Sequence, residues 1–462
     1  MFSTFLYQAV GFIVAIALLI AVHEFGHFWV ARRLGFKVLR FSIGFGRPIW
    51  AWRGGDGTEY WISRIPLGGY VKLLDEREGP VPVEEQHRAF NRRPIPHRIA
   101  VLLAGPGFNF LFAICAYWML FVAGVPGIKP FVGEVTPDSP AALAGLVEED
   151  LILSVDAQPV ETWQGTVLAL LDSILDGGDV SLQVMDSTGD KRRAVIDLRN
   201  KAAQLTEPDA LFPGIGFIPL MPKFPAVIGE LVAGEPAERA GFLAGDKVIR
   251  ADGEPIDTWG EWLSFVRGRP GEDVSVTVQR GGSLLDLELG IGTAEEDDRT
   301  IGRIGAAPSS EVRLKVAAEA RERFAAEQRY PVGAALVQGA KKTWSMSALT
   351  VRMLWRMIMG DVSVKNLSGP INIASYAGNS AQAGIGSFVT FLALISISLG
   401  IINLMPIPLL DGGQILYQLV EAVKGSPMSE RSLIVGQQVG ILVLLLIMSV
   451  AFYNDLSRIF VN

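Results

Sequence analysis

The residues best suited to chemistry lie near the start of the sequence, where positions 23–27 read His-Glu-Phe-Gly-His. Side chains four positions apart share one face of a helix, so His23 and His27 could hold one metal ion. Glu24 would then be the general base, taking a proton from a water molecule that attacks a carbonyl carbon polarised by the metal. The motif therefore predicts a catalytic metal site for peptide hydrolysis.

The surroundings of this motif strengthen the prediction. Residues 2–22 are apolar and carry no charged side chain. Ionisable groups inside a membrane are costly and usually functional. The alternative, a polar patch that holds helices together, would need only one such residue.

A catalytic zinc ion takes three protein ligands and leaves a fourth position open. The best candidate for the third ligand is Asp411, the only acidic residue between Asp361 and Glu421. It follows an apolar segment, and Pro406 and Pro408 interrupt the helix just before it. Two histidines and a carboxylate favour Zn²⁺ over other divalent ions.

The elements that position these residues are predicted to be membrane helices. The chain has 462 residues, 50% of them apolar and only 19% charged, and its single cysteine excludes a disulfide scaffold. We expect a polytopic α-helical membrane protein with four transmembrane helices, at 1–31, 99–125, 385–411 and 432–455. A secretory signal peptide is the alternative for the first segment, but the basic region that should precede its apolar run is missing.

Charge is segregated along the chain and predicts an orientation. Residues 32–98 contain thirteen basic side chains, whereas residues 129–340 have a net charge of −15. The positive-inside rule places the first block in the cytoplasm and the second outside. Asp411 then ends a helix on the inner side, at the depth of His23 and His27. The net charge of −7 argues against a nucleic-acid partner. The four apolar segments instead predict that the chain lies in a lipid bilayer.

The outer block contains a repeat. Residues 133–163 match residues 229–259 without a gap, so that Asp150 corresponds to Asp246 and Trp163 to Trp259. We therefore expect two tandem α+β domains, at 126–220 and 221–309, each closing on a glycine-rich strand. Their pattern resembles circularly permuted bacterial PDZ domains, which add an extended peptide to a sheet edge. A passive spacer or steric filter is the alternative role.

Two further regions are expected to lie at the membrane. Residues 32–98 are expected to form a membrane-associated β-hairpin region, because residues 38–72 alternate and turn like hairpins. Residues 310–384 are expected to form a linker with amphipathic interfacial helices. A substrate helix must unwind before its amides can be cleaved. We expect the hairpin to receive the unwound strand, with an ordinary cytoplasmic hairpin as the alternative; the substrate-binding candidates here are Gly44, Gly68, Gly69 and Tyr70.

Two buried amides are also candidates. Asn403 could hydrogen-bond a substrate backbone group that lost its helical partner, although helix packing would explain it as well. Asn109 has the same ambiguity and ranks below Asn403. His87 and His97 lie in the basic block and are expected to be solvated or interfacial.

These features together resemble the site-2 protease family of intramembrane zinc metalloproteases. The resemblance rests on His-Glu-x-x-His in the first span, Asn-x-x-Pro and Leu-Asp-Gly in the third, and the tandem PDZ-like repeats, and it extends to residues 41–46, 66–70, 104–110 and 366–370. It implies a bacterial inner-membrane protein with periplasmic PDZ domains and an active site toward the cytoplasm. Its implied substrate is a transmembrane anti-sigma factor already shortened by another protease, with the PDZ pair excluding unshortened chains. Gln414 departs from the family pattern, where histidine is expected, and should not contact the metal.

Two other functions stay open at this stage. One is a membrane zinc protease of another lineage that uses a later glutamate as third ligand and degrades misfolded or soluble chains. The other is a PDZ scaffold or chaperone with a vestigial site.

Overall fold

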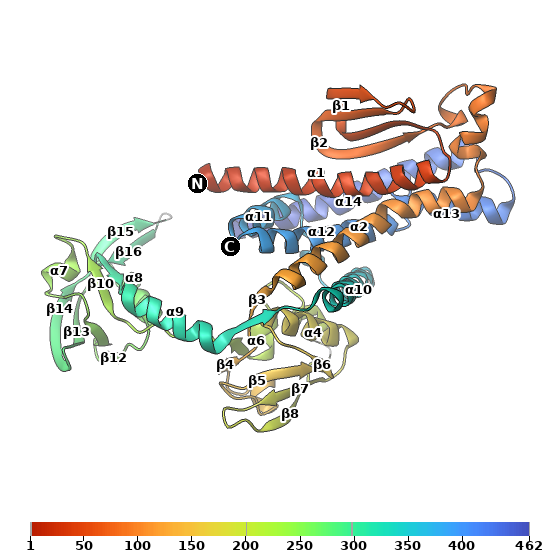
Figure 1. Ribbon diagram of the computed structural model, residues 1–462. Coiled ribbons are helices and arrows are strands. Elements are labelled where there is room, and N and C mark those ends of the chain that lie inside the picture. Colours follow the sequence, from red (N-terminus) through yellow and green to blue (C-terminus); the bar gives the residue numbers. More distant parts are fainter. Residues whose placement is uncertain (1, 200, 297–298, 462) are drawn as a thin grey trace.

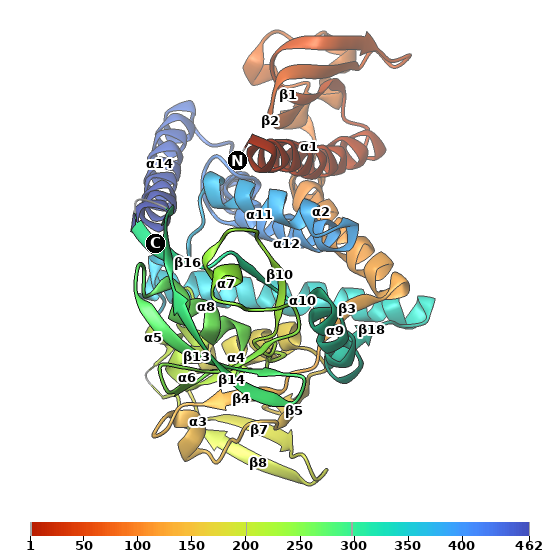
Figure 2. The same cartoon turned by 90° about the vertical axis from the view of Figure 1, so that its left-hand side faces the viewer.

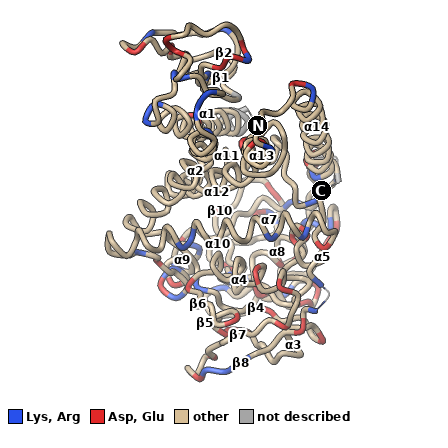
Figure 3. Tube along the Cα trace, turned by 90° about the vertical axis from the view of Figure 1, so that its right-hand side faces the viewer, with Lys and Arg blue, Asp and Glu red and all other residues tan. Residues whose placement is uncertain are grey.

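A layer of apolar helices forms the middle of the molecule in a computed structural model that describes residues 2–199, 201–296 and 299–461. Figure 1 shows this layer between a β-hairpin on one side and two α/β units on the other. Figure 3 shows that Lys, Arg, Asp and Glu are sparse in the layer and gather on both sides of it. Within the described residues, four helices are long and apolar enough to cross a membrane. They are α1 (Phe2–Arg33), α2 (Ile95–Ala123), α12 (Ile385–Leu404) and α14 (Glu430–Val461).

Helix α2 packs between α1 and α12. Gly26 of α1 lies against the backbone of Ala104, since a Cβ at Gly26 would stand 2.9 Å from the Ala104 carbonyl carbon. On the other side, the Ser396 hydroxyl of α12 donates to the Asn109 carbonyl of α2 at 2.9 Å. Because small residues let backbones approach in a membrane, the helix that carries residues 23–27 is held closely against α2.

The expected third span is not one continuous helix over 385–411. Helix α12 ends at Leu404, and Asp411 is the first residue of a separate helix, α13 (Asp411–Lys424). Pro406 and Pro408 lack the N–H that would continue the helix, so the chain leaves α12 and turns back. Gly412 allows this turn, since a Cβ there would collide with the carbonyl groups of Leu404 and Met405.

The region after α1 forms an antiparallel hairpin of β1 (Val38–Arg53) and β2 (Glu59–Leu73) that lies along α1 (Figure 1). Its register shifts around Gly44, which has φ of +90° and would bring a Cβ to 2.7 Å from the Ile65 carbonyl oxygen. Exposed Ile49 and Trp50 lie further along β1. Short 3₁₀ turns then lead to α2: η1 (Glu76–Glu78), η2 (Val83–Arg88) and η3 (Phe90–Arg92).

The sequence repeat appears as two units with the same order of strands and helices over their matched parts. The sheets β6-β5-β7-β8 and β12-β11-β13-β14 correspond, as do the pairs β4-β9 and β10-β17, and each unit encloses its own apolar core. The first unit contains β4 (Val132–Val135), α3 (Pro140–Leu143), β5 (Leu151–Val155), β6 (Gln158–Pro159), α4 (Trp163–Asp176), β7 (Val180–Met185), β8 (Lys191–Ile196), α5 (Ala202–Leu205), α6 (Leu211–Ile215) and β9 (Phe217–Pro219). The second contains β10 (Ile228–Leu231), α7 (Pro236–Arg239), β11 (Lys247–Ala251), β12 (Glu254–Pro255), α8 (Trp259–Arg267), β13 (Asp273–Arg280), β14 (Ser283–Gly290), β15 (Gly292–Glu296), β16 (Arg299–Arg303) and β17 (Ala306–Pro308).

The closing strands begin after the glycines rather than on them. Gly216 and Gly305 have φ of +92° and +70°, so they turn the chain into β9 and β17. The glycine-rich segments 214–217 and 302–305 are predicted to be the closing strands, and this is only partly correct. Gly214 and Ile215 lie in α6, whereas Gly302 and Arg303 lie in strand β16.

A buried aspartate stabilises the same turn in each unit. Asp246 accepts hydrogen bonds from the Leu243 backbone N–H at 2.8 Å and from the Arg280 guanidinium at 2.7 Å. In the first unit Asp150 accepts hydrogen bonds from the Val147 N–H and from Arg192, both through Oδ2. Burial opposes the charged form of Asp246, but the guanidinium and the N–H outweigh it and lower the pKa of this carboxyl.

The outer units are attached to the helices through a two-stranded ribbon. β3 (Val125–Ile128), directly after α2, pairs with β18 (Ala325–Gln328), which follows α9 (Ser310–Phe324). The amphipathic helix α10 (Val332–Met359) comes next and contacts the first unit, where Arg352 pairs with Asp172 and with Asp176 at 3.1 Å. Figure 2 shows α10 between the outer units and the helix layer. The sequence did not predict this ribbon.

A second unforeseen contact joins α14 to α11 (Pro370–Gln382), which follows the short turn η4 (Val364–Asn366). The buried Asp455 carboxylate of α14 accepts hydrogen bonds from the backbone N–H groups of Gly369 and Ile371, both at 2.9 Å. A carboxylate at a helix N-terminus satisfies N–H groups that have no partner within the helix. Helix α11 in turn packs on α1, where Gly378 contacts the backbone of Gln8.

Candidate metal centre

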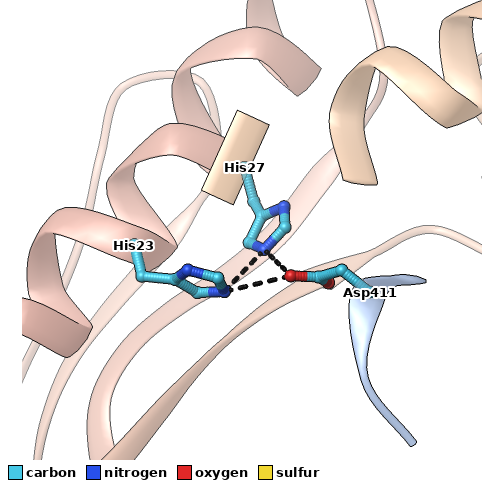
Figure 4. Close-up of side chains that lie close together, drawn as sticks. All are labelled: His23, His27 and Asp411. Carbon is cyan, nitrogen blue, oxygen red and sulfur yellow. Dashed lines mark hydrogen bonds and ion pairs between the residues drawn. The ribbon is translucent and has the colours of Figure 1, made fainter. Parts of the chain in front are cut away.

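Three side chains from two distant parts of the chain converge inside the helix layer. The Asp411 Oδ2 atom lies 3.2 Å from His23 Nε2 and 3.4 Å from His27 Nε2, and the two Nε2 atoms are 3.2 Å apart. Figure 4 shows both imidazoles pointing from one helix toward the carboxylate. These side chains are 9%, 12% and 16% exposed for His23, His27 and Asp411.

The distances match a tetrahedral metal site. Two zinc–ligand bonds of about 2.05 Å at the tetrahedral angle separate their ligand atoms by about 3.3 Å. The three observed separations all lie close to that length. In addition, Asp411 Oδ2 is a buried oxygen without a hydrogen bond within the part of the chain that the structure describes. The donor set and its spacing therefore fit Zn²⁺ with one coordination position left for water or substrate.

Both imidazoles are oriented through their second nitrogen. His27 Nδ1 donates to the Val101 carbonyl at 2.8 Å, which leaves Nε2 without a proton and free to bind a metal. His23 Nδ1 lies 3.1 Å from the amide of Asn109. Both partners lie on α2, so the close packing of α1 on α2 also fixes the two ring orientations.

Gly105 of α2 leaves the space that these rings need. A Cβ at this position would stand 2.6 Å from His27 Cε1 and 2.7 Å from His23 Cε1, and closer still to His27 Nε2. Only glycine fits there without moving a ligand.

A buried ion pair fixes the helix that carries Asp411. Arg98 of α2, 5% exposed, donates to both carboxylate oxygens of Glu421 on α13, at 2.7 and 3.2 Å. A two-point contact between planar groups restricts rotation as well as separation. Helix α13 is therefore fixed on α2 at Glu421, in the same helix that begins with Asp411.

The triad borders a cavity of about 810 Å³ that also contains Glu24. Strand β2 forms one wall, where a Cβ at Gly69 would stand 2.9 Å from Glu24 Cγ. The other predicted substrate-binding residues on this wall are Gly68 and Tyr70. A backbone laid along β2 would therefore pass beside Glu24.

The remaining candidates divide into those at the cavity and those away from it. Asn403 lines the cavity, with its Nδ2 3.5 Å from His23 Nε2, so it belongs to the site rather than to helix packing alone. Gly44 is placed in the β-bulge behind the wall, and its neighbour Phe45 reaches the cavity instead. Gln414 lines the cavity, and the absence of a metal contact at this residue stays a prediction.

Sequence reasoning gave too little weight to three contributions from α2. Asn109 was ranked below Asn403, although a fully buried amide in a membrane helix is itself a signal of function. Gly105 belongs to the segment 104–110 that was noted without a role. The pairing of Arg98 with Glu421 left no local pattern, because the two residues are 323 positions apart.

Comparison with known proteins agrees with this geometry. The family described as "Peptidase family M50" matches residues 11–447. The chain is 42% identical over 457 residues to "Regulator of sigma E protease" of Salmonella typhi, covering 98% of this chain and 99% of that protein. It is 42% identical over 459 residues to "Regulator of sigma-E protease RseP" of Escherichia coli, covering 99% and 100%. It is 40% identical over 456 residues to "Putative zinc metalloprotease" of Vibrio cholerae, covering 98% and 99%.

Proposed function

Because the chain belongs to peptidase family M50 and is thus a site-2-type metalloendopeptidase of the inner membrane, we propose that it is an intramembrane zinc endopeptidase acting on transmembrane segments. The observation that carries this proposal is the meeting of His23, His27 and Asp411 within the apolar layer. A metal site at that depth is suited to peptide bonds that lie in the membrane.

The residues divide the chemistry between them. His23, His27 and Asp411 would hold Zn²⁺, which supplies Lewis acidity for the scissile carbonyl and lowers the pKa of water at the open position. Glu24 takes the proton from the attacking water and later gives it to the departing amine. The side chains of His23, His27 and Asp411 are mostly buried, so the charges that develop during attack would be stabilised by fixed groups rather than by bulk water.

The substrate must enter this cavity as an extended strand. A helical segment keeps each amide in an i to i−4 hydrogen bond, so several bonds must open before a carbonyl can reach the triad. Gly68, Gly69 and Tyr70 on β2 would receive the unwound backbone by strand addition. Asn403, which lines the same cavity beside His23, would bond a backbone group that has lost its helical partner.

The names of the relatives indicate a substrate class. Several are called regulators of sigma-E, and we assign to this chain the cleavage of a transmembrane anti-sigma factor that another protease has already shortened. The two outer units, interpreted as periplasmic PDZ domains at 126–220 and 221–309, would bind the new substrate end or exclude unshortened chains. The basic block around β1 and β2 would face the cytoplasm, and the zinc site would open toward that side.

A protease of another lineage would need a later glutamate as third ligand. The proximity of Asp411 to both histidines removes that need, so degradation of soluble or misfolded chains is the weaker alternative.

The test uses the purified full-length protein in lipid nanodiscs with a transmembrane peptide, and cleavage is followed by mass spectrometry. We expect Glu24→Gln to keep one zinc per chain and to lose at least about 10²-fold in rate, as for a general base. Asp411→Ala should lose zinc and activity together, and a chelator should abolish wild-type cleavage. Glu319→Gln, at an exposed position on α9, is the matched control and should cleave normally.

Two results would contradict the proposal. One is cleavage by zinc-free protein at the wild-type rate. The other is cleavage of only the water-exposed parts of the peptide.

A further inference from the structure

Asn109 has an unusual position for a residue that only packs helices. It lies on α2 with no exposed surface, and its amide stands 3.1 Å from His23 Nδ1. Its Oδ1 atom is buried and has no hydrogen-bond partner among the described residues. A neutral amide in the apolar layer with a free acceptor beside an imidazole is a costly arrangement unless that acceptor is used.

The protonation of the His23 imidazole suggests what this acceptor could bind. A neutral imidazole carries one proton, and only the nitrogen without it can bind a metal. His23 faces Asp411 and His27 through Nε2, so metal binding there requires the proton on Nδ1 and an acceptor for it. At His27 that acceptor is the Val101 carbonyl.

The Asn109 amide can supply the corresponding acceptor for His23. With Nδ2 toward Nδ1, the amide donates and the ring proton sits on Nε2, where it blocks metal binding. A half-turn about the Cβ–Cγ bond exchanges the two ends of the amide and brings Oδ1 to about the place that Nδ2 holds. Nδ1–H then donates to Oδ1, and Nε2 is free.

We propose that Asn109 is a positioning residue that holds His23 in its metal-binding tautomer by accepting a hydrogen bond from Nδ1–H. The proposal rests on the proposed function, since it takes His23 to be a zinc ligand. It assigns to Asn109 a role toward the ligand and not toward the substrate backbone.

Two substitutions separate accepting a hydrogen bond from filling space. Asn109→Leu keeps the number and branching of side-chain heavy atoms and removes the acceptor, whereas Asn109→Asp keeps an oxygen at the same position. The matched control is Ser396→Ala, which removes the hydrogen bond from α12 to the Asn109 carbonyl without touching the imidazole.

Zinc affinity of the full-length protein in detergent, measured by competition with a chromogenic chelator, is the first readout. We expect Asn109→Leu to bind zinc 10- to 100-fold more weakly, as for other partners that orient a ligand. Asn109→Asp should stay within about 3-fold of wild type on the same principle, and so should Ser396→Ala. The second readout is the visible absorption of the Co²⁺-loaded protein, which should change in Asn109→Leu only.

Excess zinc provides the third readout, because it should restore cleavage by Asn109→Leu if the lesion lies in metal binding. Unchanged zinc affinity in Asn109→Leu overturns the proposal, and so does equal weakening in Ser396→Ala, which would indicate helix packing. These results are distinct from failure of the proposed function, in which the wild-type protein itself would bind no zinc.

Discussion

Replacing Gly105 by alanine tests the geometry of the metal centre most directly. The new Cβ would stand 2.6 Å from His27 Cε1 and 2.7 Å from His23 Cε1. Ordinary contacts between such atoms begin near 3.5 Å, so the rings must retreat by about 0.8 Å or more. Zinc sites tolerate errors of only about 0.2 Å in ligand position. We therefore expect zinc affinity to fall at least about 100-fold, beyond what loss of an orienting partner costs.

The matched control lies two positions away on the same helix. Outside the backbone of its own helix and its two chain neighbours, a Cβ at Gly107 would have no atom of the described residues within 4 Å. Gly107→Ala should therefore keep its zinc and become slightly more stable, since alanine is favoured over glycine in a helix interior by about 1 kcal/mol.

The assay is zinc per chain after dialysis, measured by atomic absorption, with circular dichroism to verify that both variants stay helical. If Gly105→Ala retains zinc and cleaves like wild type, the two imidazoles do not meet beneath α2 in the way described. Loss of zinc from both variants would instead point to a general effect on α2 and would equally refute the reasoning.

Three further outcomes are expected. Glu421→Gln removes the charge that pairs with buried Arg98, and removing one partner of a buried ion pair costs about 3–5 kcal/mol. The thermal midpoint and the zinc content should therefore both fall. Unchanged values would show that this ion pair does not fix α13 on α2. Gly69→Ala should retain zinc but slow cleavage by about 10²-fold, because the new Cβ would displace Glu24 and a displacement of about 1 Å can have that effect. A rate equal to that of the wild type would exclude close contact between β2 and Glu24. Asp246→Asn should lower the thermal midpoint of the outer domains at pH 7. Because the folded-state pKa of Asp246 is lowered, its stabilisation is fully present above the unfolded pKa of about 3.9 and is lost as the pH falls through the folded-state pKa, so the effect should shrink at acidic pH. Calorimetry across pH checks this, and an effect that does not depend on pH would contradict it.

The sequence predicted the parts of this protein that have a periodic residue pattern or a defined position relative to the membrane. The apolar segments gave the membrane helices, and the fixed offset of Asp150 and Asp246 gave the duplicated units. The site candidates followed from i, i+4 spacing and from the side of the membrane at which Asp411 arrives. Each of these signals is local or additive along the chain.

The parts that could not be predicted depend on contacts between distant residues. Nothing near Arg98 indicates Glu421, and nothing near Asp455 indicates that it caps α11. The break before α13 was visible in Pro406 and Pro408, but where the returning helix packs depends on α2. Side-chain pairing of this kind is decided by the folded arrangement and leaves no periodic trace.

The ribbon of β3 and β18 brings the point where the chain leaves the helix layer next to the point where it returns. Residues 129–324 are therefore an insertion into the helical part of the chain, and the two ends of this insertion lie side by side in the ribbon. An insertion of this kind can be exchanged, lengthened or lost without changing how the helices that carry His23, His27 and Asp411 are connected. The fold of the outer units and the geometry of the metal centre are therefore specified by separate parts of the chain.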